Sequence, residues 1–92
     1  MMPDDAPRIH IDPHTSARAL ERGTNEVEIL DVIRTETSIP AHGNRCGKAE
    51  VYDYNGEWNG KFYPQKRVEV VYVTTDDEVT TVTVYVFFGR WR

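Results

Sequence analysis

Hydrophobic and polar residues alternate most regularly near the C-terminal end of the chain, between Arg67 and Phe88. This stretch reads RVEVVYVTTDDEVTTVTVYVFF, which is two β-branched, aromatic-rich runs separated by Asp76-Asp77. Such runs around a short polar turn predict an antiparallel hairpin. One parity of the second run is apolar and suits a dry core: Val82, Val84, Val86 and Phe88. The other parity carries hydroxyls and rings: Thr81, Thr83, Tyr85 and Phe87.

Two helices are predicted upstream of this hairpin. The first begins at Asp12-Pro13, because aspartate caps free backbone N–H groups and proline suits the first helical position. It ends at Gly23, the residue type best suited to a left-handed cap. The second begins at Asn25, where Glu28 completes an asparagine version of the capping box before an apolar face.

The segment between the helices and the C-terminal hairpin is predicted as a loop over 41–47 and a strand over 48–54. Two Asn-Gly steps follow, Asn55-Gly56 and Asn59-Gly60, and each favours a hairpin turn. Residues 61–63 form either a short strand that Pro64 stops or part of a long loop. Residues 1–11 are interpreted as a tail, in which alternating isoleucines allow a short edge strand.

This order of elements predicts an α+β two-layer sandwich. Two N-terminal helices pack on one face of a three- or four-stranded antiparallel sheet, because consecutive antiparallel strands need only short turns. A chain of 92 residues with 39% hydrophobic and 28% charged residues predicts one globular domain over 1–92.

Charge and cysteine content restrict the class of protein. The net charge of −4 argues against a protein that coats nucleic acid through bulk positive charge, although it permits a local cationic pocket. Cys46 is the only cysteine, and no apolar run approaches the roughly 18 residues that span a bilayer. We therefore expect a cytoplasmic protein without a membrane partner. The absence of a Gly-rich phosphate loop predicts no nucleotide cofactor.

Several segments, in their order and spacing, resemble one family. These are HTSARALERGTNEVEILDVI, a lysine-bearing strand, RVEVVYVTT and VTVYV. The most specific parts are the run His14-x3-Arg18-x3-Arg22-Gly23 and the Thr83-x-Tyr85 step. Over about residues 9–91 the chain resembles a family of small bacterial proteins of unknown function, the 4258-type domain. That family is similar to the RelE, ParE and BrnT toxins of toxin–antitoxin systems.

The resemblance implies two helices against a curved antiparallel sheet, and it implies action on messenger RNA under the control of a small protein antitoxin. Metal-free RNA cleavage needs an acid, a base and fixed positive charge near the phosphate. The candidate catalytic residues are His14, Arg18, Lys48 and Tyr85. The candidate substrate-binding residues are Arg22, Lys66, Arg67 and Thr83. In the alternative interpretation, Arg18 and Glu21 form an ordinary surface pair beside His14.

Two other groups of side chains have alternative interpretations. Four side chains can bind zinc, but their spacing matches no strong zinc motif, so no metal is predicted: His10, His14, His42 and Cys46. Five aromatic residues suit either base stacking, a core margin or a dimer interface: Tyr52, Tyr54, Trp58, Phe62 and Tyr63. The alternative to an RNA-directed function is therefore a non-enzymatic module that forms a homodimer or binds a protein through a sheet edge or these rings.

Overall fold

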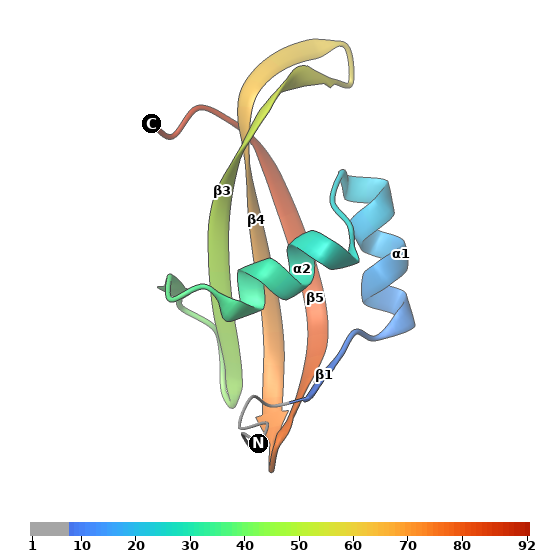
Figure 1. Cartoon of the computed structure of the whole chain (residues 1–92), viewed down its shortest axis with the longest axis vertical. Helices are drawn as coiled ribbons and strands as arrows, with labels where there is room; N and C mark the ends of the chain where they lie inside the picture. Colours follow the sequence, from blue (N-terminus) through green and yellow to red (C-terminus); the bar gives the residue numbers. More distant parts are fainter. Residues whose placement is uncertain (1–7) are drawn as a thin grey trace, which may run out of the picture.

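The computed structural model describes residues 8–92, in which two helices cover one face of a five-stranded sheet (Figure 1). The helices are α1 (Pro13–Arg22) and α2 (Glu26–Arg34). The strands are β1 (Arg8–His10), β2 (Ser38–Ile39), β3 (Arg45–Trp58), β4 (Lys61–Thr75) and β5 (Glu78–Gly89). Their order across the sheet is β1-β5-β4-β3-β2.

The α+β arrangement is confirmed, but the predicted sheet of three or four antiparallel strands is wrong. The sheet is mixed, because β1 pairs parallel to β5 while the other neighbours pair antiparallel. The two additional strands are β1 and β2. Strand β1 lies where the alternating isoleucines allowed a short edge strand, whereas β2 has two residues, which is too short for a clear alternation in the sequence. The predicted tail over 1–11 includes β1, and its first seven residues lie outside the described part of the chain.

Both helices begin where their capping residues predict. The side chain of Asp12 accepts a hydrogen bond from the backbone N–H of His14 at 2.8 Å. The side chain of Asn25 accepts one from the backbone N–H of Glu28 at 2.9 Å. Helix α1 ends at Gly23, which has a φ of 95°. These bonds satisfy backbone donors that a helix start leaves free, so local sequence suffices to fix the helix starts.

The hairpin of β3 and β4 is longer than predicted and extends beyond the helices (Figure 1). Its turn is Asn59-Gly60, with φ angles of 54° and 82°. The other Asn-Gly step is not a turn, because the pairing register shifts at Asn55-Gly56 and β3 continues through a bulge. Pro64 does not stop β4. It lies opposite this bulge, where a missing N–H donor breaks no regular ladder bond.

A second bulge changes the predicted parity of β5. Val71 of β4 pairs with Thr83, but the next β4 residue pairs with Thr81, which leaves Val82 as the extra residue. Val82 is therefore only partly buried, while Thr81 is buried. The hydroxyl of Thr81 accepts the backbone N–H of Asp12 at 3.0 Å, which satisfies this polar atom inside the protein. The prediction that Val82 lies in the core is wrong, and the residues after the bulge keep their predicted parity.

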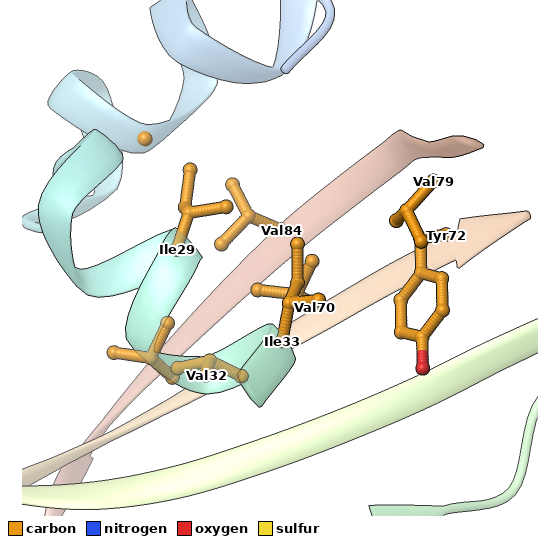
Figure 2. Close-up of a cluster of buried hydrophobic side chains, with 9 residues drawn as sticks. Ile29, Val32, Ile33, Val70, Tyr72, Val79 and Val84 are labelled. Atoms are coloured by element: carbon orange, nitrogen blue, oxygen red, sulfur yellow. The ribbon is translucent and has the colours of Figure 1, made fainter. Parts of the chain in front are cut away.

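The core lies between the helices and one face of β4 and β5. Apolar side chains of α2 meet those of the two strands there (Figure 2): Ile29, Val32, Ile33, Val70, Tyr72, Val79 and Val84. Burying one such aliphatic side chain contributes about 1.5–3 kcal/mol to stability. Neither α1 nor α2 covers the other face of the sheet, which we call the open face. Paired residues of β4 and β5 define it: Arg67 with Phe87, Glu69 with Tyr85, and Val71 with Thr83.

Candidate functional site

The four candidate catalytic residues do not converge on one cleft. His14 and Arg18 lie on the exposed surface of α1. Lys48 lies on the helix-covered face of the sheet, since its register partner is the core residue Val70. Tyr85 lies on the open face. Because the sheet separates Lys48 from Tyr85, the expected common site of these four side chains is not formed.

Lys48 and Lys66 contact the ends of the two helices rather than an open surface. The Nζ of Lys48 donates to the carbonyl of Thr35, the C-terminal cap of α2, at 2.8 Å. The Nζ of Lys66 donates to the carbonyl of Gly23, the cap of α1, at 2.8 Å and pairs with Glu28 at 2.8 Å. Cations at helix C-termini are favourable because the last carbonyls lack intrahelical partners. In the structure both lysines contact helix ends, whereas the sequence predicted a catalytic role for Lys48 and substrate binding for Lys66.

His14, Arg18 and Arg22, which are spaced four residues apart on α1, do not share one set of contacts. The Nε of Arg18 lies 3.5 Å from Nε2 of His14, and its guanidinium pairs with Glu21 at 3.6 Å. This is the ordinary surface pairing that the alternative interpretation described. Arg22 instead reaches the sheet, where its Nη1 donates to the carbonyl of Val84 at 2.5 Å. It is the one of these three residues that approaches Tyr85, with its guanidinium carbon 5.5 Å from the ring centroid.

The open face contains a pocket of about 220 Å³. Strands β4 and β5 form its floor, and residues 39–42 with the start of β3 form its wall. Its polar side chains come from four separate segments: His42, Arg45, Glu69, Thr83 and Tyr85. Ligand sites typically combine an apolar lining with a few convergent polar groups, and this pocket has both. It includes two of the predicted site residues, Thr83 and Tyr85.

A glycine allows the wall of the pocket to approach the sheet. Ile39 of β2 pairs with Gly47 of β3. A Cβ atom on Gly47 would lie 2.7 Å from Cγ1 of Ile39 and 3.0 Å from its carbonyl oxygen. Any larger residue at position 47 would push β2 outward, and the loop that carries His42 would move with it. The absence of a side chain at Gly47 therefore helps to shape this edge of the pocket.

Two aromatic rings stand on the open face beside the pocket. Tyr85 and Phe87 are 43% and 48% exposed, and they are two residues apart on β5, so they share this face. Arg67 lies opposite Phe87 in the register, and its Nε donates to Oε2 of Glu69 at 2.9 Å. The face thus combines exposed rings, hydroxyl groups and arginines, which is a surface able to contact a planar, anionic molecule.

The charges of the two faces differ. Three acids gather on the helix side around the hydroxyl of Tyr52: Glu28, Asp31 and Glu50. On the other side, the positive charges of Arg45 and Arg67 lie on the open face and Arg22 lies at its β5 edge. Asp53, Glu69 and Glu78 are acids whose register positions place them on this face. The open face therefore carries charges of both signs, and its arginines are the groups suited to contact an anion.

Three of the five aromatic residues pack around Phe88, a ring that was not among the five. Phe88 stacks on Trp58 with a centroid distance of 4.8 Å and meets Tyr54 edge-on at 5.0 Å and Tyr63 at 5.6 Å. A Cβ atom on Gly23 would lie 3.0 Å from the Phe88 ring, so α1 ends against this cluster. These rings form a core margin, as one of the open interpretations predicted.

Sequence reasoning missed His42, Arg45 and Glu69 as members of one pocket. His42 was considered only as a metal ligand, and Arg45 lies in a stretch predicted as loop although it begins β3. One local signal did exist, because Arg67 and Glu69 alternate with valines on β4 and so share one face. The loop contribution had no local signal, because it depends on β2 pairing with β3.

The pKa of Tyr52 is raised well above its usual value of about 10, first by burial and then by a 2.5 Å hydrogen bond to Asp31 and the charge of that carboxylate. Burial and the neighbouring Cys46 also raise the pKa of Tyr72. A raised phenol pKa means that the folded state keeps a proton that the unfolded state loses above about pH 10. The resulting stability is fully present below pH 10 and falls as the pH rises beyond it.

We therefore expect the free energy of unfolding to decrease above about pH 10, by at most about 1.4 kcal/mol per pH unit for Tyr52 and by less where solvent screens the charges. Tyr52→Phe should be less stable than wild type at pH 8, because it loses the bond to Asp31, and this difference should shrink at pH 10.5. Urea unfolding at both pH values measures the effect. A difference that stays constant would contradict the assignment, and Tyr63→Phe is the matched control.

The remaining candidate ligands do not gather. His10 lies on β1, His14 on α1 and His42 in the loop before β3, and Cys46 is exposed on β3. Within residues 8–92, no group of three or more His, Cys, Asp or Glu side chains could hold a metal ion. In the same part of the chain, neither helix has the length and apolar character needed to cross a membrane.

Comparison of the chain with models of protein families, with curated proteins and with solved structures finds no match. The resemblance to the 4258-type family and to the RelE, ParE and BrnT toxins therefore remains a prediction.

Proposed function

We propose that this protein binds single-stranded RNA on the open face of its sheet. The observation that carries the proposal is the pair of exposed rings, Tyr85 and Phe87, beside the arginines of the same face. Aromatic side chains on a sheet stack with unpaired bases, and arginines at the margin bind the backbone phosphates. The acids around Tyr52 lie on the helix side, so they do not oppose an anionic strand on the open face.

The binding test is a titration of fluorescently labelled single-stranded RNA of about ten nucleotides, followed by anisotropy at several salt concentrations. Neutralisation of about three phosphates by Arg22, Arg45 and Arg67 predicts a slope of log K against log salt near −2. A duplex of the same sequence should bind more weakly, because its bases are stacked on each other and cannot reach the rings. Absence of binding even at low salt would overturn the proposal.

We extend the proposal to metal-free cleavage of the bound RNA, in which a 2′-hydroxyl loses its proton and attacks the adjacent phosphate while the 5′-oxygen leaves and gains a proton. His42, rather than His14, is the acid or base that transfers a proton in this step. Histidine is the side chain that most often transfers protons in enzymes, and His42 lines the same pocket as Tyr85 and Arg45. His42→Ala should lower the cleavage rate by about 100-fold or more and leave RNA affinity within about threefold. His14→Ala is the matched control, and gel analysis of labelled RNA measures both. Equal rates for wild type and H42A would contradict this role.

The alternative, a protein-interaction module or homodimer, has less structural support on the surfaces first considered for it. Three rings of the aromatic cluster already pack against Phe88 within the protein. At the β5 edge Arg22 occupies the carbonyl of Val84, and at the β3 edge Arg92 occupies that of Val51. Such contacts protect an edge against strand addition. Leu20 and Val27 are exposed on the helices, and this feature favours a protein partner. Sedimentation of the protein as a monomer would exclude the homodimer.

A further inference from the structure

The pocket on the open face places one carboxylate among hydrogen-bond donors. Glu69 lines the pocket together with Arg45, Thr83 and Tyr85, all of which carry N–H or O–H groups. Ile39 and Val71 contribute apolar surface. A ligand that fits this lining needs a flat apolar body, donors on one side for the carboxylate, and acceptors elsewhere for the arginine and hydroxyl groups.

The carboxylate of Glu69 is held in place by one hydrogen bond and can accept more. Its Oε2 accepts a bond from Nε of Arg67 at 2.9 Å. The hydrogen bonds formed among residues 8–92 leave Oε1 without a donor. Because a carboxylate has about four lone-pair sites, Glu69 can still accept two hydrogen bonds from a ligand. Arg67 restricts the rotation of the side chain, so Glu69 is prepared for such a ligand before it binds.

Among the RNA bases, guanine matches this requirement. Its Watson–Crick edge presents a ring N–H and an exocyclic amino group side by side, so a carboxylate can accept from both. Adenine and cytosine place a ring acceptor beside their amino group, and that acceptor would face the carboxylate oxygen unfavourably. Uracil offers a single ring N–H between two carbonyl acceptors. The O6 and N7 acceptors of guanine suit arginine donors such as Arg45.

We propose that this pocket binds a guanine base and that Glu69 determines this specificity through the Watson–Crick edge. The inference rests on the proposed function for its RNA source, since a base of a strand on the open face would enter the pocket beside Tyr85. A free guanine nucleotide offers the same chemistry. The experiment therefore distinguishes a guanine within an RNA strand from a free guanine nucleotide as the ligand.

The experiment measures the affinity of wild-type protein for oligouridine RNAs that carry one central guanosine, adenosine or inosine. Inosine lacks only the exocyclic amino group, so it tests the contact without changing the protein. We expect the guanosine RNA to bind about tenfold more tightly than the adenosine RNA, as for one well-formed pair of hydrogen bonds, and the inosine RNA, which keeps the ring N–H, to bind with intermediate affinity. In Glu69→Gln this preference should fall below about threefold, because the amide presents a donor beside its one acceptor.

Asp53→Asn is the matched control for charge. Asp53 shares the open face but does not line the pocket, so D53N should raise affinity for all three RNAs equally and keep the preference for guanosine. Equal affinities of wild type for the three RNAs would overturn the guanine assignment and leave the proposed function standing. Guanosine monophosphate bound more tightly than adenosine monophosphate, with no RNA bound, would keep the assignment and overturn RNA binding. Absence of binding to any RNA or nucleotide would overturn both.

Discussion

Replacement of both Tyr85 and Phe87 by threonine should weaken the binding of single-stranded RNA by about 30-fold or more. Stacking of one base on an aromatic side chain contributes about 1–3 kcal/mol, and the two rings are half-exposed on the same face. Threonine retains a high preference for β-strands, so β5 should keep its structure. Anisotropy titrations give the affinity, and circular dichroism with thermal unfolding reports whether the variant is folded.

The matched control for this double variant is Leu20→Ala. Leu20 is an apolar side chain with 73% exposure on α1, so its loss removes exposed hydrophobic surface from the helix side alone. We expect L20A to bind RNA as wild type does. If the folded Y85T/F87T variant keeps full affinity, RNA does not bind the open face. If L20A alone loses affinity, the helix side is the binding surface instead.

Lys66 and Arg67 should show opposite effects although they are adjacent in the sequence. Lys66→Met should lower the free energy of unfolding by about 2–3 kcal/mol, because it leaves the carbonyl of Gly23 and a partly buried Glu28 without their cation. The side chain of Lys66 is 10% exposed, and methionine preserves most of its packing. Its RNA affinity, measured at a temperature where it is folded, should match that of wild type.

Arg67→Met is the matched variant on the open face. Arg67 makes a partly exposed pair with Glu69, so its removal should change stability by about 1 kcal/mol or less. RNA affinity should fall by about three- to tenfold at low salt, and the salt slope should decrease by about 1. Urea unfolding and RNA titration of both variants give the four values. Loss of RNA affinity in folded K66M with no loss in R67M would contradict the assignment of the faces.

The predictions that succeeded depend on contacts within a few residues of sequence. The starts of α1 and α2 follow from Asp12 and Asn25, which bond to backbone donors two or three residues away. The Asn59-Gly60 turn follows from backbone preferences of those two residues. The sequence by itself therefore determined the helices, the C-terminal hairpin and the α+β class.

The predictions that failed required the position of a distant segment. The same Asn-Gly dipeptide forms a turn at Asn59 and a bulge at Asn55. The step at Asn55 is not a turn because β3 pairs with β4 on both sides of it. The bulge at Val82 reverses side-chain parity before it, and no local pattern marks that step. Sequence alone could not decide between these outcomes, since strand register is a property of two segments together.

The candidate site shows the same division. Local alternation placed Thr83 and Tyr85 together, and this part of the site was available from the sequence. Only the tertiary structure decided that Lys48 and Lys66 contact helix ends 13 and 43 residues away in the sequence. It also decided that the loop with His42 lines the same pocket as Glu69. A long charged side chain can reach several possible hydrogen-bond partners. The packing of the elements decides which of them is near, and the adjacent residues in the sequence do not.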